Sequence, residues 1–168
     1  MRRRRPSGNM VLETALWIPV LLLLIVGTIQ FGKITYLYYS LKKAVYTAAR
    51  YISVQQGINF CDPNDPTVQA AIQLAVTGTL DGSGNPLISN LTADMLQVTT
   101  ECADPFNPGG ALISCDLSGC GGPAGAQRPD YIVVSIPAGY PVQPRIPFIT
   151  LDPISFRPSV AVPFGGTS

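Results

Sequence analysis

A long apolar run is the dominant pattern in the first third of the chain. Residues 14–32, between Glu13 and Lys33, contain no charged side chain. As an α-helix they would measure about 28 Å, close to the roughly 30 Å hydrocarbon core of a bilayer. A secretory signal peptide has a shorter apolar region, about 7–15 residues, followed by a small-residue cleavage site, and no such site follows here. The run therefore predicts a transmembrane helix over residues 9–33 that stays in the mature protein.

The helical pattern continues beyond this run. Apolar residues recur at spacings of three and four, and the basic residues of the segment fall elsewhere on the helical wheel. The apolar positions are Ile34, Leu37, Leu41, Val45, Ala48 and Ile52. Gly57 is of the residue type that most often ends a helix. The pattern predicts a continuation of the helix over residues 34–57, so that one helix of roughly 70 Å would run from about Met10 to Gln56.

A second, shorter helix is expected after the first. Asp65 is a suitable N-cap, Pro66 is a suitable first helical residue, and an apolar face follows as far as Gly78. Residues 81–86, rich in Gly, Asn and Asp and ending in Pro, predict a loop directly afterwards. This part of the chain is therefore helix followed by turn.

The remainder of the chain predicts a small sheet. Alternating and β-branched runs indicate strands at residues 95–100, 131–136 and 154–162. In the strand at residues 131–136, Ile132, Val134 and Ile136 would share one face. The strand at residues 154–162 contains Pro158, which is typical of an edge strand. Residues 103–129 are expected to form an irregular surface excursion. Seven prolines from Pro137 to Pro163 favour extended connections that are poor in hydrogen bonds.

Together these elements predict the fold class α+β. A chain of 168 residues allows one membrane segment and one small domain. We expect a long helix that carries a small antiparallel sheet, with residues 58–168 forming an α+β domain with Pro- and Gly-rich loops.

The distribution of charged residues predicts how the chain is oriented across the membrane. Four of the eleven basic residues are Arg2 to Arg5, directly before the apolar run, and without residues 1–8 the side chains sum to −3. Positive residues beside a membrane span stay on the cytoplasmic side, so the N-terminus is expected inside and residues 58–168 outside. A net negative remainder argues against a nucleic-acid partner, which would need a basic face.

The one acid at the edge of the apolar run needs an explanation. Glu13 would sit inside the bilayer edge, where a carboxylate costs roughly 2.5–3.5 kcal/mol on insertion scales. A positive charge at the same depth would offset this cost. Cleavage of the chain after Gly8 would create one, the new α-amine of Asn9. An assembly ion pair between Glu13 and that amine is therefore expected.

The residues around Gly8 and Glu13 carry a family resemblance. Ser7 to Glu13 resembles the processing site of type IV-like prepilins, which a membrane peptidase cuts after Gly and whose mature chains have Glu at the fifth position. The likeness extends through Leu12-Glu13-Thr14-Ala15-Leu16, Ile18-Pro19, Gly27, Phe31-Gly32-Lys33 and Ala48-Ala49-Arg50-Tyr51. Over about residues 7–53 the chain resembles the TadE-like proteins, minor pilins of the tight-adherence (Tad) pilus. It departs from them at Thr14, where relatives often have an aromatic, and at Gln30, where many have an acid.

This resemblance implies a role and a set of partners. Residues 1–8 would be a basic leader removed by a prepilin peptidase at Gly8/Asn9, and the product would be a minor pilin or pseudopilin used in pilus assembly, adhesion or secretion. Its partners would be other pilin and minor-pilin subunits, the assembly platform in the inner membrane and the lipid bilayer. The helix of residues 34–57 would pack partly on the chain's own sheet and partly on neighbouring subunits. The alternative is an unprocessed, singly anchored periplasmic module that binds another protein.

Pro19 lies inside the expected span and predicts a helix kink. It has no N–H to bond the carbonyl of Ala15 and crowds that carbonyl. Membrane helices tolerate such a proline because neighbours satisfy the freed carbonyl. A loosened helix would also help a subunit to leave the bilayer and pack into a filament, and both interpretations are open.

Four cysteines, Cys61, Cys102, Cys115 and Cys120, lie outside the expected span. In a small extracytoplasmic domain they predict two disulfides. Of the three possible connectivities we favour Cys61–Cys102 with Cys115–Cys120, since the second pair would close a short Gly-containing loop. A zinc site is the competing interpretation, but the chain has no His.

No cofactor, metal or enzymatic chemistry is expected. Asp81, Ser83 and Asn85 have the spacing of the first ligands in a calcium loop, but Thr92 stands where the bidentate acid is needed, which favours a turn. Without His the usual general base is missing, and no nucleophile has a recognisable activating partner. The expected function is therefore structural and not catalytic.

Overall fold

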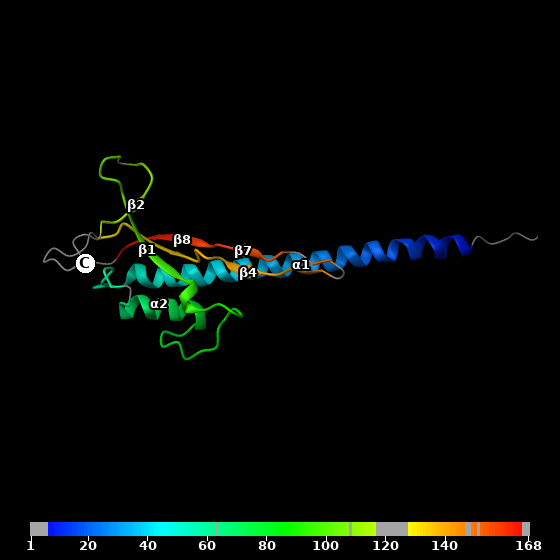
Figure 1. The fold of residues 1–168 in the computed structure, drawn as a ribbon, viewed down its shortest axis with the longest axis horizontal. Helices are drawn as coiled ribbons and strands as arrows, with labels where there is room; N and C mark the ends of the chain where they lie inside the picture. The colour runs from blue at the N-terminus through cyan, green and yellow to red at the C-terminus, as the bar shows by residue number, and fades with distance from the viewer. Residues whose placement is uncertain are drawn as a thin grey trace, which may run out of the picture. The chain divides into compact units, whose positions relative to one another are not determined.

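The computed structural model describes residues 7–62, 64–107, 109–116, 128–146, 149–150 and 152–165. In these residues two α-helices and a short 3₁₀ helix precede all of the strands (Figure 1). The helices are α1 (Ser7–Val54), α2 (Pro66–Thr77) and the 3₁₀ helix η1 (Ala93–Met95). The strands are β1 (Gln97–Cys102), β2 (Ile113–Ser114), β3 (Tyr131–Ser135), β4 (Tyr140–Val142), β5 (Arg145–Ile146), β6 (Ile149–Thr150), β7 (Ile154–Phe156) and β8 (Ser159–Pro163). The fold class is α+β, as predicted.

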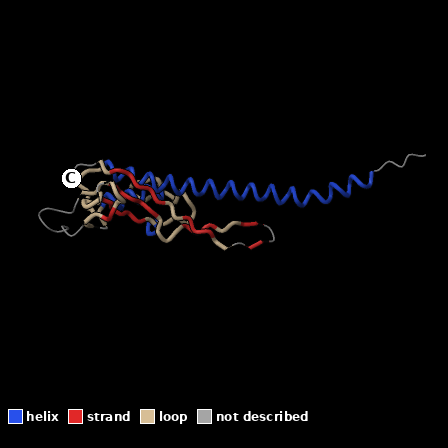
Figure 2. The backbone as a smooth tube through the Cα atoms, turned by 90° about the horizontal axis from the view of Figure 1, so that it is seen from above, coloured by secondary structure: helices blue, strands red, loops and turns tan. Residues whose placement is uncertain are grey.

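Helix α1 is continuous over 48 residues and includes Pro19 (Figure 2). Its observed start and end lie within a few residues of the predicted Met10 and Gln56. The helix gives way to a turn in which Gly57 has a φ of +71°, a conformation that glycine adopts without steric cost. The predicted long helix is thus confirmed, whereas the kink near Ala15 stays a prediction.

The chain divides into two compact units, one of residues 1–36 and 142–154 and the other of residues 37–141 and 155–168. The first unit contains most of the apolar run of α1 and the short β5–β6 ladder, in which Arg145 pairs with Thr150. The second contains the C-terminal part of α1, α2 and the larger sheet. Each unit is described by itself below.

The core of the second unit uses the predicted face of α1. Leu41, Val45, Ala48 and Ile52 are fully buried, and Ala44 and Ala49 are buried beside them. Small alanines allow a close approach of neighbouring elements, and the longer aliphatic side chains supply the apolar area that stabilises the packing. The C-terminal part of α1 is therefore an integral part of this domain.

Helix α2 has the caps that the sequence predicts. The Asp65 carboxylate accepts hydrogen bonds from the backbone N–H groups of Thr67 (2.8 Å) and Val68 (3.3 Å), and Pro66 is the first helical residue. At the other end Gly78 takes the left-handed conformation, with φ +79°, and donates its N–H to the Leu74 carbonyl. These local interactions set both ends of the helix.

The larger sheet is antiparallel, with strand order β2-β1-β3-β8. Strand β3 pairs with β1 on one side and β8 on the other. Ile132, Val134 and Ile136 are fully buried, as their predicted shared face requires, and Val133 on the opposite face is buried as well. The strand predicted at residues 131–136 is therefore an interior strand of this sheet, next to the other interior strand, β1.

Two strand predictions need correction. The strand expected at residues 95–100 begins later, because residues 93–95 form η1. The run 154–162 is broken at Arg157–Pro158 into β7 and β8, which pair with β4 and β3. Proline has no N–H for a ladder, and the Pro158 carbonyl instead accepts a hydrogen bond from Ile136 N (3.1 Å). Both strands are edge strands, as predicted: β8 at one edge of the four-stranded sheet and β7 in a two-stranded sheet.

The proline-rich segment is more regular than predicted. Between Pro137 and Pro163 the structure contains the β4–β7 and β5–β6 ladders in addition to β8. Proline is compatible with edge strands, whose outer backbone groups need no partner in the sheet. Both short ladders are separate two-stranded sheets, in which every strand is an edge strand.

Candidate functional site

The predicted processing site lies in the first turn of α1. The described part of the helix begins at Ser7, so the Gly8–Asn9 peptide bond lies in its first described turn. Glu13 is four residues after Asn9, and therefore on the same side of the helix one turn later.

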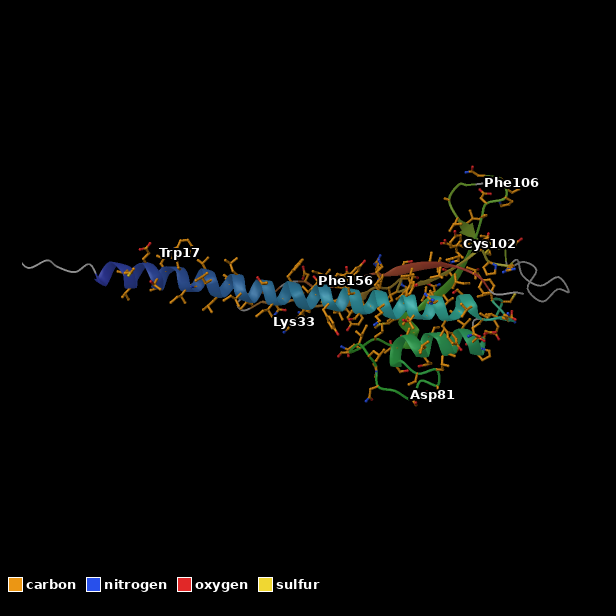
Figure 3. All side chains as sticks on the ribbon, turned by 180° about the vertical axis from the view of Figure 1, so that it is seen from behind. Trp17, Lys33, Asp81, Cys102, Phe106 and Phe156 are labelled. Atoms are coloured by element: carbon orange, nitrogen blue, oxygen red, sulfur yellow. A yellow bond between two sulfur atoms is a disulfide. The ribbon has the colours of Figure 1, made fainter. Side chains whose placement is uncertain are left out.

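The Glu13 carboxylate stands in apolar surroundings. It is exposed beside Leu12, Leu16 and Trp17, which line a shallow hollow on the helix surface. Figure 3 shows Trp17 extending outward from the helix. The acid is therefore a single polar group on an otherwise apolar stretch of helix.

The apolar part of α1 is long and apolar enough to cross a membrane. Its most apolar window has a mean hydropathy of 2.3 and buries none of its residues. Large aliphatic and aromatic side chains between Met10 and Phe31 are exposed, for example Leu16 at 70%. A contiguous apolar surface of this kind marks a contact with lipid or protein.

Hydroxyl groups on α1 have hydrogen-bond partners within the helix itself. Each threonine donates to the carbonyl four residues earlier, at distances of 2.7–2.9 Å. The donors are Thr14, Thr28, Thr35 and Thr47, and the acceptors are the carbonyls of Met10, Leu24, Phe31 and Lys43. Because an unpaired hydroxyl is costly in an apolar medium, this bonding makes the helix compatible with hydrocarbon.

The favoured cysteine pairing is wrong. Cys102 forms a disulfide with Cys115, across 13 residues of sequence. The reason is the pairing of β1 with β2, which places Cys102 opposite Ile113 and brings the two Cα atoms of the disulfide to 4.9 Å. Cys61 is also disulfide-bonded, and Cys120 lies outside the described residues.

Sequence reasoning missed the loop that this disulfide closes. Residues 103–129 were expected to be irregular, but β2 returns to pair with β1. Asp130 supports the base of the loop, because its carboxylate accepts a hydrogen bond from Ala103 N (2.7 Å). A cysteine at the end of one strand and another thirteen residues later was the available signal.

The calcium-like spacing at Asp81 is a turn. The Asp81 carboxylate accepts hydrogen bonds from Ser83 N (3.2 Å) and Ser83 Oγ (2.9 Å), and these bonds lower the pKa of Asp81. Among the described residues, no group of three or more His, Cys, Asp or Glu side chains is placed to hold a metal ion. The hydrogen bonds of a tight turn account for these residue types.

A cleft of about 650 Å³ lies between α2, η1 and β1. Its lining includes Phe60, Ile72 and Val98, together with the carboxylates of Asp62 and Asp94. No Lys, Arg or His is among the described residues that line it. The cleft is thus a mixed apolar and acidic surface.

Comparison with known proteins gives a match within helix α1. The model of the TadE-like protein family matches residues 8–50, which run from the predicted cleavage site to the last turns of α1. No curated protein and no solved structure matches the chain. Over residues 8–50 the chain is therefore similar to TadE-like proteins.

Proposed function

We propose that this chain is a minor pilin or pseudopilin subunit of a Tad-type pilus, cut after Gly8 by a prepilin peptidase. The observation that carries the proposal is the arrangement of Gly8, Asn9 and Glu13 over two turns at the start of an exposed apolar helix. A simple membrane anchor has no use for an acid at this position. The subunit serves pilus assembly, adhesion or secretion.

The proposed topology follows from charge and helix length. Residues 9–33 cross the inner membrane once, with Arg2 to Arg5 on the cytoplasmic side. The helix continues outside the membrane over residues 34–57, and residues 58–168 complete a periplasmic domain. Disulfide bonds in that domain suit an oxidising compartment.

The proposed ion pair joins Glu13 to the amine that cleavage creates on Asn9. Side chains on an α-helix lean toward its N-terminus, so the Glu13 carboxylate leans toward Asn9 in its own chain. The same amine can instead face the acid of a neighbouring subunit. The second arrangement neutralises two charges in the bilayer only on assembly, and so favours packing in one axial register.

The partners of the proposed subunit act in sequence. The prepilin peptidase removes residues 1–8, the lipid bilayer holds the cleaved chain, and other pilin and minor-pilin subunits pack against it at the assembly platform. Whether the subunit enters the fibre or only initiates it, the same helix surface is used.

The deciding experiment is to determine the N-terminal residue of the mature protein. N-terminal sequencing and intact mass of protein extracted from membranes that contain an active prepilin peptidase should begin at Asn9. Gly8→Glu should retain all eight leader residues, because the peptidase needs a small residue at the cut. Ser7→Ala is the matched control and should be cut normally. A wild-type chain that begins at Met1 or Arg2 would refute the proposal.

The alternative function is an unprocessed, singly anchored periplasmic module that binds a protein. The cleft between α2 and β1 favours it, since a concave surface of mixed character suits a peptide or a protein segment. The same N-terminal measurement separates the two functions, because only the pilin requires cleavage.

A further inference from the structure

The C-terminal part of α1 carries a basic and aromatic surface that its own domain leaves uncovered. This surface, here called the α1 stripe, consists of Tyr39, Lys42, Lys43, Tyr46 and Arg50. Tyr39 is 69% exposed and Tyr46 is 44% exposed, and Arg50 Nη1 lies 3.3 Å from Tyr46 Oη in a hydrogen bond. The stripe lies opposite the buried face of α1, and no acid occurs in the sequence between Glu13 and Asp62.

A second uncovered surface is the loop closed by the Cys102–Cys115 disulfide. Phe106 near its tip is 95% exposed, and Figure 3 shows this side chain far from the rest of the domain. The backbone around it is held in place: the Asp104 carboxylate accepts from Phe106 N (2.9 Å), and Gly110 N donates to the Asn107 carbonyl (2.9 Å). An accessible aromatic ring on a stapled loop can serve as an anchor for a partner.

The loop has the opposite charge to the stripe. Residues 101–116 contain Glu101, Asp104 and Asp116 and no Lys or Arg. Asp130 at the base of the loop, which accepts a hydrogen bond from Ala103 N, is balanced in formal charge by Arg128, so the negative charge of the loop is that of residues 101–116. Opposite charges around aromatic groups are the features of a complementary interface.

We propose that the Cys102–Cys115 loop of one copy docks on the α1 stripe of a second copy. Phe106 packs against Tyr39 and Tyr46, and the loop carboxylates face Lys43 and Arg50. The two surfaces do not cover each other within one chain, as the exposure of Phe106 and Tyr39 shows. Because loop and stripe are different patches, the contact is head-to-tail and can repeat from copy to copy. The proposal rests on the proposed function, for which it names the partner.

Anionic lipid fits the stripe less well. Tyr39 and Arg50 are separated by about 16 Å along the helix axis. The interfacial layer on one side of a bilayer is only roughly 5–8 Å thick. Only the first turn of the stripe could therefore meet headgroups if the helix crosses the membrane, whereas a protein partner can contact all of it.

The test is photo-crosslinking of the full-length chain in its native membrane, with benzoylphenylalanine in place of Phe106. We expect crosslinked dimers in which the label maps by mass spectrometry to residues 39–50 of the second copy. The double variant Lys43→Glu/Arg50→Glu should lower the dimer yield about tenfold, because it sets like charges against each other. Asp104→Asn keeps the acceptor for Phe106 N, removes one charge, and should lower the yield about threefold.

Arg157→Glu is the matched control, an exposed charge reversal on a loop outside the stripe, and should leave the yield unchanged. Labels found only on lipid, on another protein or on other residues of the second copy would overturn the proposal. Leader cleavage is read by blot from the same samples. Uncut chains that still crosslink at the stripe would refute the pilin function and leave the docking contact standing, and cut chains without the crosslink would do the reverse.

Discussion

At the residue scale, a few polar groups have positions that packing alone does not explain. Glu13 is the strongest case, because it is exposed on a helix whose neighbouring side chains are apolar. Asp65 is another, since it is 7% exposed and still carries a carboxylate. Its three backbone hydrogen bonds compensate the cost of burial. Glu13 requires a partner of a different kind.

Glu13→Ala should separate assembly from insertion. Membrane insertion and leader cleavage should be unchanged, because a neutral helix enters a bilayer at least as easily as one with an acid. Incorporation into pili, or into the complex that initiates them, should fall sharply. If charge is required, Glu13→Gln should be incorporated into pili as poorly as Glu13→Ala. If a hydrogen bond suffices, it should be incorporated as well as wild type. Cleavage blots and sheared-pilus content measure the two steps, and normal assembly of Glu13→Ala would remove the ion pair from the mechanism.

Asp65→Ala should destabilise the domain by about 1–3 kcal/mol, because it removes the cap of α2 and leaves the N–H of Asn59 without its acceptor. Asp65→Asn should lose less stability, since its one side-chain oxygen can still accept the hydrogen bond from Thr67 N. Urea unfolding of the full-length protein in detergent, followed by tyrosine fluorescence, measures the difference. Equal losses for the two variants would mean that charge, and not capping, is what Asp65 supplies.

At the element scale, α1 is one continuous helix whose two parts have different patterns of exposed side chains. Its first part exposes apolar side chains on all sides, as a helix does in lipid, and its later part buries only one face. The hairpin of β1 and β2 is the second element of note, because the Cys102–Cys115 disulfide joins its strands at the base of the loop. The loop therefore keeps its shape although its tip has few contacts.

The double variant Cys102→Ser/Cys115→Ser should lower the free energy of unfolding by about 2–4 kcal/mol, mainly by freeing the unfolded chain. The double substitution avoids a lone thiol, and buried Cys102 makes some loss of packing certain. Urea unfolding of the double variant and of wild type, both without reductant, measures the effect, because reductant would also open the disulfide of Cys61. If the double variant is as stable as wild type, the Cys102–Cys115 bond contributes nothing to stability.

At the scale of the whole molecule, the α1 stripe contains basic residues and no acid. The acids of the second unit lie on the loops, η1 and β1, where Arg128 and Arg157 are found as well. Such a division lets copies associate through unlike surfaces, and salt should weaken the association by screening. The predicted result is that raising salt from about 0.05 to 0.5 M lowers Phe106 crosslinking severalfold. An unchanged yield would point to a purely apolar contact.

The amino-acid sequence by itself determined the long helix, the caps of α2 and the strand β3 with its shared apolar face. These features depend on neighbours a few residues away: the length of an apolar run, the i to i+4 period, and a side chain that caps its own helix. The relation of Gly8 to Glu13 is equally local, and the similarity to TadE-like proteins likewise lies within one continuous segment, residues 8–50.

Only the tertiary structure decided the cysteine pairing, the break at Pro158 and the surfaces that stay uncovered. The Cys102–Cys115 bond follows from the register of β1 with β2, and that register depends on residues far apart in the chain. The division into β7 and β8 depends on separate partners, β4 and β3, that no local pattern specifies. The α1 stripe is likewise defined by what the sheet and α2 leave exposed, because burial is a property of the packed chain and not of the helix alone.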